Sequence, residues 1–347
     1  MTLATALATA IATGDLTQLP SRRDEDWRWT DLRGLIRTMP PASPAFTGVA
    51  GEGPFAADET LLVANGAGPS TLTIAPGESR VVALRFLSAA DRTAHAARVA
   101  ITVGEGARLT LLESHEGRAA GYLAQSDLDI RLAAGASLER IVLVDDEGEA
   151  VSVVIATVAL AATASFSQTV LTSGARRQRI ETRVSHPGQG ASVRLDGVYL
   201  LDGQRHADLT TAVTHGGTDG TTSQLTKGVV DGQARGVFQG RITVEPGADR
   251  TDARMGHHAL ILSDRAEIDA KPELLIFADD VACAHGNTIG ALDEEAIFYA
   301  RQRGMPLDVA RALLTEAFIG EVIDRIDHEA ARDVARAWVN DRLGAAQ

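Results

Sequence analysis

The chain has 347 residues, of which 45% are hydrophobic and 23% charged, an ordinary composition for a folded protein. Its formal net charge of −13 argues against a nucleic-acid partner, because phosphate binding needs clustered lysine and arginine. The single cysteine excludes an internal disulfide, so we expect a cytoplasmic protein.

Two apolar stretches resemble targeting or membrane segments, but neither fits one. Residues 3–12 have no basic residue before them and are followed by polar residues, unlike a signal peptide. Residues 151–166 are interrupted by serine and threonine and fall short of a bilayer span. We therefore expect no membrane segment.

Residues 1–45 are predicted to form an N-terminal helical region. Residues 3–12 and 24–37 have the pattern of short helices, and the second opens on three acids beginning at Asp24, which suits a helix N-terminus. Several prolines then end the region. A glycine-rich linker is expected over residues 46–59.

Residues 60–286 are predicted to form a β core, because apolar and polar residues alternate there. Two examples of inward-facing sets are Val99, Ile101 and Val103, and Leu128, Ile130 and Leu132. No convincing helix pattern interrupts this region.

Small-residue turns recur in this core at a near-constant spacing. Gly106, Gly135, Thr163 and Gly190 each precede an alanine and separate two apolar strands, and they are 29, 28 and 27 residues apart. Such a period is typical of a solenoid, in which every coil makes the same corner. A β-sandwich or double barrel is the alternative, but its turns recur roughly every 8–12 residues.

Residues 287–347 are predicted to form a C-terminal helical domain. The first helix begins at the acidic run from Asp293 and ends before Gly304, the second begins with Pro306 as its first helical residue, and the third passes through Trp338. We expect this domain to close the end of the solenoid, where an uncovered strand edge would invite aggregation.

The only cysteine lies in the last part of the predicted core. Cys283 and His285 are two residues apart where a strand is expected to end, so their side chains should share one face. Thiolate and imidazole suit iron and zinc, which makes this pair the candidate metal or cluster site. The alternative is that Cys283 is a small buried apolar residue. Asp279 and Asp280 could add oxygen ligands, although a polar turn is their more ordinary role.

Other histidines are weaker candidates. His257 and His258 are adjacent on a predicted strand, so they point to opposite faces and cannot both bind one ion. His186, His206 and His215 are predicted to be surface residues in turns.

Three classes of enzyme find little support in the sequence. A cupin would need an H-x-H pattern with a downstream Glu and His, which the histidines of residues 206–217 do not supply. A carbohydrate-active β-helix enzyme would need carboxylates in a cleft, whereas Asp196, Asp202 and Asp208 are expected in turns. The GxxxxGK[ST] motif is absent, so we expect no ATP hydrolysis by this chain.

Three blocks resemble the SufB/SufD family of iron–sulfur cluster assembly proteins. They are residues 21–32 (SRRDEDWRWTDL), residues 206–244 (beginning HADLTTAVTH) and residues 269–305 (containing ELLIFADDVACAHGNTIGALDEEAIFYARQRG), the last being the most specific. The chain is more similar to SufD members than to SufB members, because it is shorter, has one cysteine, and carries His257 where SufB members have a cysteine.

This resemblance implies a right-handed parallel β-helix between small N-terminal and C-terminal helical domains. It also implies a non-catalytic scaffold that pairs with SufB through the β-helices and binds the ATPase SufC through the C-terminal domain. The expected SufC contact is the helix corner at Arg301, Gly304, Met305 and Pro306. A homodimer without SufB is left open, and a stand-alone β-helix metalloenzyme is the alternative function.

The resemblance further assigns the candidate site. Cys283 and His285 match a cysteine and a histidine of the family near the SufB–SufD interface, where they would hold iron or an edge of a nascent cluster. His257 is a secondary candidate. No cofactor is expected to bind tightly to the isolated chain.

Overall fold

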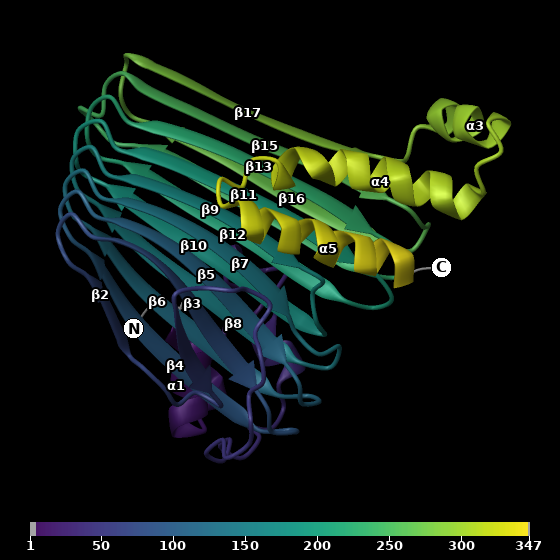
Figure 1. Ribbon diagram of the computed structural model, residues 1–347, viewed down its shortest axis with the longest axis horizontal. Coiled ribbons are helices and arrows are strands. Elements are labelled where there is room, and N and C mark those ends of the chain that lie inside the picture. Colours follow the sequence, from purple (N-terminus) through teal and green to yellow (C-terminus); the bar gives the residue numbers. More distant parts are fainter. Residues whose placement is uncertain (1–4, 346–347) are drawn as a thin grey trace.

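The computed structural model describes residues 5–345. These residues form a parallel β-helix, preceded in the chain by short helical segments and followed by three helices (Figure 1). The odd-numbered strands form a nine-stranded sheet and the even-numbered strands form an eight-stranded sheet. Each strand pairs in parallel with the strand two places along the chain, as in a solenoid with two strands per coil. The predicted solenoid is therefore confirmed, and the sandwich alternative is excluded.

The strands are β1 Glu59–Ala64, β2 Thr71–Ile74, β3 Ser79–Ser88, β4 Ala94–Val103, β5 Arg108–Gly117, β6 Leu123–Leu132, β7 Ser137–Asp145, β8 Val151–Leu160, β9 Ser165–Thr172, β10 Arg177–His186, β11 Ser192–Leu201, β12 His206–His215, β13 Thr221–Val230, β14 Arg235–Val244, β15 Thr251–Ile261, β16 Glu267–Ile276 and β17 Val281–Gly290. The strand region thus ends at Gly290, beyond the expected boundary at residue 286. Its inner faces contribute an apolar core cluster that includes Val99, Ile101, Val103, Leu128, Ile130 and Leu132, as predicted.

The recurring turns form one corner of the solenoid. Gly106, Gly135, Thr163 and Gly190 all adopt a left-handed backbone, with φ between 55° and 67°. Each donates its backbone N–H to a carbonyl in the corner of the next coil, so the corners are hydrogen-bonded in a column. Three residues outside the predicted run, none of them followed by an alanine, make the same hydrogen bond with the same left-handed backbone. They are Gly77, Asp219 and Arg250.

Gly106→Ala is expected to lower the free energy of unfolding by about 1 kcal/mol, because φ is 63° and a left-handed backbone costs that much for a residue with a Cβ. No atom lies within 4 Å of the added Cβ, so steric clash makes no contribution. Denaturant unfolding would measure the change. Gly290→Ala also adds a Cβ in open space but without a positive φ, and serves as the control. Equal unfolding energies for the two variants would contradict the strain argument.

The N-terminal region is less helical than predicted. It contains α1 Ala6–Thr13 and three short elements, which are η2 Leu16–Gln18, η3 Glu25–Trp27 and α2 Leu32–Leu35. The prediction of one helix over residues 24–37 is wrong, and the beginning of the helix predicted over 3–12 lies outside the described residues. The backbone between η3 and α2 is not helical, and around this break Trp27 and Thr30 are buried in contact with Arg179 and Asp208 of the eight-stranded sheet.

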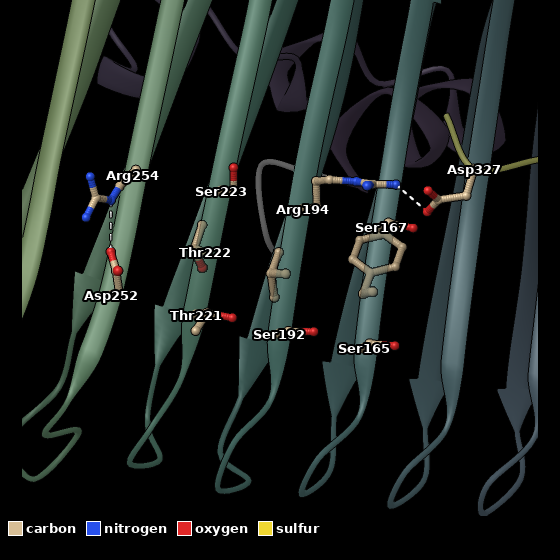
Figure 2. A pocket seen from close by; sticks show the side chains of 12 residues that line it. Ser165, Ser167, Ser192, Arg194, Thr221, Thr222, Ser223, Asp252, Arg254 and Asp327 are labelled. Carbon is tan, nitrogen blue, oxygen red and sulfur yellow. Dashed lines mark hydrogen bonds and ion pairs between the residues drawn. The ribbon is translucent and has the colours of Figure 1, made fainter. Parts of the chain in front are cut away.

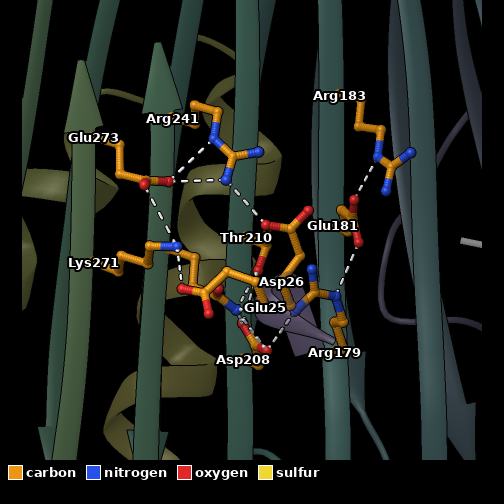
Figure 3. A network of polar contacts seen from close by, with 11 residues as sticks. Glu25, Asp26, Arg179, Glu181, Arg183, Asp208, Thr210, Arg241, Lys271 and Glu273 are labelled. Carbon is orange, nitrogen blue, oxygen red and sulfur yellow. Dashed lines mark hydrogen bonds and ion pairs between the residues drawn. The ribbon is translucent and has the colours of Figure 1, made fainter. Parts of the chain in front are cut away.

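The same segment is tied to the sheet by charged contacts (Figure 3). The Trp27 ring covers the guanidinium of Arg179 at 4.3 Å, and Thr30 Oγ1 donates to Asp208 Oδ2 at 2.5 Å. Arg179 Nη1 in turn lies 2.7 Å from the same carboxylate oxygen. Further along, ion pairs join Asp26 to Arg241 and Glu25 to Lys271. The segment of residues 25–30 therefore packs across β10, β12, β14 and β16.

The C-terminal domain consists of α3 Glu294–Gln302, α4 Leu307–Ile323 and α5 Glu329–Ala345. Asp293 caps α3 and Gly304 follows it with φ of 85°, as predicted, whereas Pro306 precedes the first residue of α4 by one position. None of the described helices is long and apolar enough to cross a bilayer.

The expectation that this domain closes the end of the solenoid is wrong. Helices α4 and α5 lie along the outer face of the nine-stranded sheet (Figure 1). They cover an apolar stripe of that face formed by Leu112, Ile141, Leu143, Leu171, Val198, Leu200, Leu225, Val229 and Leu260. Because these side chains offer the apolar surface that the helices need, the helices pack there and leave the last coil, β16 and β17, uncovered.

Candidate metal or cluster site at the open end of the solenoid

Cys283 and His285 lie on β17, the last strand of the nine-stranded sheet. The parallel register pairs Cys283 with Ala253 and His285 with Met255, both of which are buried and point into the solenoid. The two side chains therefore share the inner face, as predicted. They do not lie where a strand ends, because β17 begins at Val281 and continues to Gly290.

Among the described residues 5–345, no further coil stacks on β16 and β17, so the inner face of β17 is open. β17 has a single neighbour, β15, and most of its residues are exposed. Cys283 is half-buried against the core, whereas His285 is exposed. Burial raises the pKa of the Cys283 thiol above its usual value. A metal ion bound there would therefore have to displace the thiol proton.

Two ligands are all that this coil offers. Among residues 5–345, no group of three or more histidine, cysteine, aspartate or glutamate side chains is arranged to hold a metal ion. Asp279 and Asp280 are exposed in the turn between β16 and β17, and the backbone carbonyl of Asp280 accepts from the Arg250 N–H of the corner column. Cys283 and His285 therefore form an incomplete coordination site.

His257 lies on the same inner face, but both of its ring nitrogens are hydrogen-bonded within the protein. Its side chain is fully buried, with Nδ1 donating to Asn287 Oδ1 at 2.6 Å and Nε2 accepting from Tyr199 Oη at 2.9 Å. Burial lowers its pKa to about 4, so the ring is neutral at neutral pH. Both ring nitrogens are used within the protein, which disfavours His257 as a metal ligand.

Exposed apolar side chains surround the open coil. Leu275, Ile276 and Phe277 at the end of β16 are 42%, 42% and 62% exposed, and Ile289 on β17 is 44% exposed. Sequence analysis did not single them out, although the run LLIF at residues 274–277 was a visible signal. Large apolar side chains clustered at a strand edge mark an interaction surface.

One family model matches most of the chain. Residues 86–318 match the family model described as "SUF system FeS cluster assembly, SufBD core domain". The chain belongs to the SufBD family. The resemblance drawn from residues 269–305 is thereby confirmed, and all of these residues lie within the matched region.

Curated relatives of this SufBD chain include proteins named as SufD. The iron–sulfur cluster assembly protein SufD of Escherichia coli is 33% identical over 180 residues, covering 52% of this chain and 42% of that protein. A SufBD family protein of Synechocystis is 29% identical over 254 residues, covering 70% and 56%. The chain thus spans about half the length of these relatives. A SufBD family protein of Mycobacterium bovis is 27% identical over 373 residues, covering 95% and 90%.

The remaining histidine candidates of the SufBD chain are structural. His186, His206 and His215, predicted to be exposed in turns, are buried at strand ends. The rings of His186 and His215 meet edge to face with centroids 3.9 Å apart, too close for a metal ion between them. His215 lies between His186 in one neighbouring coil and the buried Val244 in the other, so these two histidines continue an apolar column of the core. His206 instead has its Nε2 3.1 Å from the backbone carbonyl of Trp29 in the N-terminal segment.

Two of the three aspartates predicted in turns are also buried in strands. Asp196 on β11 and Asp208 on β12 are 3% and 0% exposed, and only Asp202 lies in a turn. Asp208 pairs with Arg179, and Asp196 lies 3.2 Å from Arg325 Nε at the α4–α5 corner. Both carboxylates therefore anchor the terminal segments and do not line a catalytic cleft.

A groove of about 470 Å³ lies on the outer face of the nine-stranded sheet (Figure 2). Hydroxyl side chains from β9, β11 and β13 line it. Two arginines also line it, and both are already paired, Arg194 with Asp327 and Arg254 with Asp252. The groove contains neither Cys283 nor His285, so it is separate from the candidate site.

The α3–α4 corner of the SufBD chain is exposed as predicted, with Arg301, Gly304 and Pro306 exposed and Met305 half-buried. Beside it, the α3 side chains Phe298 and Tyr299 are 65% and 60% exposed. Figure 1 shows that α3 projects away from the solenoid.

Proposed function

We propose that this chain is a non-catalytic, SufD-type scaffold subunit of the SUF iron–sulfur cluster assembly machinery. It pairs with SufB through the open coil and binds the ATPase SufC through α3 and α4, in the cytoplasm. The single observation that carries the proposal is the open coil β16–β17, which presents Cys283 and His285 beside a cluster of exposed apolar side chains.

The incomplete ligand set supports a shared site. One thiolate and one imidazole leave an iron ion or a cluster iron short of its usual four ligands. A SufB strand placed against β17 would bring its own side chains to the same inner face, because parallel or antiparallel pairing continues the alternation of faces. The iron or nascent cluster is cargo of the assembly, and its displacement of the thiol proton couples binding to pH.

The edge chemistry supports a β-helix partner. β17 has unpaired backbone groups on one side, and Phe277 and Ile289 offer apolar surface that a partner would cover. A non-catalytic role is supported by the relatives, whose names describe assembly proteins.

The test is to coexpress the chain with SufB and SufC and to measure iron and sulfide in the purified complex. Cys283→Ser and His285→Ala are each expected to leave assembly intact and to lower cluster content by about half or more, because each removes one ligand of a four-coordinate site. Phe277→Asp is expected to prevent SufB capture, since it places a charge in the apolar interface.

Ala284→Ser is the matched control, because residue 284 lies between the two candidate ligands but on the opposite face of the strand. It should retain both assembly and cluster. Full iron and sulfide in both ligand variants would rule out Cys283 and His285 as required ligands. Normal SufB capture by the Phe277→Asp variant would rule out the open coil as the interface.

A further inference from the structure

The register of β17 decides where the candidate ligands point. As an edge strand, β17 is bonded to β15 alone, whereas inner strands have a neighbour on each side. Side chains alternate along a strand, so a slip by one residue would turn Cys283 and His285 from the inner to the outer face. The backbone hydrogen bonds between β15 and β17 can form in more than one register, so side-chain contacts must select the observed one.

Two adjacent histidines on β15 each bond to the residue directly opposite on β17. On the inner face, His257 Nδ1 donates to Asn287 Oδ1 at 2.6 Å. On the outer face, His258 Nδ1 lies 2.7 Å from Thr288 Oγ1. The parallel register pairs these same residues, His257 with Asn287 and His258 with Thr288. The two bonds therefore join β15 and β17 from both faces of the sheet.

The His257 ring, which forms the inner-face bond, is held in place by two aromatic neighbours. The His257 ring stacks on Phe238 with centroids 4.6 Å apart and planes 2° from parallel, and Tyr199 Oη donates to Nε2. Because Asn287 Oδ1 can only accept, the proton of the neutral ring lies on Nδ1 and faces β17, and Nε2 accepts from Tyr199 Oη. That N–H is buried, so leaving it without an acceptor would be costly.

Either one-residue slip breaks at least one bond. If β17 moves one way, Gly286 comes opposite His257 and offers no side-chain acceptor. If it moves the other way, Ile289 comes opposite His258 and likewise offers none. Both bonds can form together only in the observed register.

We propose that His257 and His258 are positioning residues that lock the register of β17 and so hold Cys283 and His285 on the inner face of the open coil. The importance of this lock for metal binding rests on the proposed function. The lock itself is a property of the isolated chain and is tested without SufB, SufC or iron.

The test uses hydrogen–deuterium exchange of the full chain, followed by mass spectrometry of peptides covering residues 281–290. Asn287→Leu and Thr288→Val each remove one bond by a change at an exposed position of β17, and both leave the buried His257 and the half-buried His258 unchanged. Each is expected to speed exchange of β17 about fivefold, and the double variant more, as the loss of one hydrogen bond predicts. Modification of the Cys283 thiol by a charged reagent should accelerate in parallel, because a slipped strand exposes it.

Conservative variants separate the lock from a general loss of packing. Asn287→Asp and Thr288→Ser retain an oxygen acceptor and should exchange as slowly as the natural chain. Arg254→Ala is a further control, since this exposed β15 side chain bonds only to Asp252 on its own strand.

Unchanged exchange and thiol reactivity in the double variant would overturn the proposal. So would equal acceleration by the leucine and aspartate variants at position 287. A chain that shows the expected exchange but carries no iron with SufB would contradict the proposed function alone, so the two failures are distinguishable.

Discussion

Replacing Glu113 by alanine is expected to lower the free energy of unfolding by about 3–5 kcal/mol, the usual cost of leaving a buried charge without its partner. Glu113 and Arg140 are both fully buried inside the solenoid, and Arg140 Nε and Nη2 donate to the carboxylate at 2.8 and 2.7 Å. His115 Nε2 bonds to the same group at 2.7 Å. Denaturant unfolding of the variant and the natural chain would measure the difference.

The double variant Glu113→Leu/Arg140→Met is the matched control. It removes both charges and fills the space with apolar side chains, so it should recover most of the lost stability. A double variant as unstable as Glu113→Ala would show that packing, and not the unpaired guanidinium, causes the loss.

The Glu113–Arg140 pair should also make the stability of the protein depend on pH in the acid range. Despite its burial, the charges of Arg140 and His115 and their hydrogen bonds lower the pKa of Glu113 from 4.5 to about 2. A carboxyl with a depressed folded-state pKa contributes stability that is present above its unfolded pKa and lost as the pH falls. We therefore expect the contribution to fade between pH 4.5 and 2, and Glu113→Gln to remove that part of the pH dependence.

Phe298→Asp is expected to weaken SufC capture by tenfold or more if α3 forms the proposed contact, because truncation of a hot-spot side chain in a protein interface costs roughly 2 kcal/mol or more. Phe298 is 65% exposed on the projecting helix α3, beside the predicted corner of Arg301 to Pro306. Titration of purified SufC against the chain would measure the loss.

Val49→Asp is the control. It makes the same kind of apolar-to-acid change, and Val49 is 91% exposed in the N-terminal linker. Unchanged SufC affinity in the Phe298→Asp variant would remove α3 from the interface. A point variant is preferable to deletion of residues 291–347, because α4 and α5 cover the apolar stripe around Val198 and Leu225, which deletion would expose.

The solenoid could be predicted because its corners impose a residue requirement. Gly106, Gly135 and Gly190 adopt a backbone that glycine accepts easily, so their spacing is visible in the sequence. Asp219 and Arg250 occupy the same corner with side chains that give no such signal. Their backbone is held by hydrogen bonds to the next coil and by the ion pair between them, which only the folded solenoid creates.

The environment of the candidate site was less predictable. Alternation placed Cys283 and His285 on one face, but nothing local to β17 shows that this strand is the last and has an open inner face. The burial of His186 and His215 was missed because each is the last residue of its strand. Whether a residue there points into the core depends on how the coils on either side stack against it. The role of His257 depends on its register partner, which lies 30 residues away in the chain.

The terminal segments also change how the solenoid should unfold. A stack of coils in contact with nearest neighbours alone behaves as a one-dimensional array, in which each coil can melt in turn. Here the segment around Trp27 spans β10 to β16, and α4 with α5 spans β5 to β15, so distant coils must unfold together. β17 lies beyond both spans. It should therefore have low local stability and open more often than the coils that the two spans join, unless another chain packs against it and makes it an interior strand.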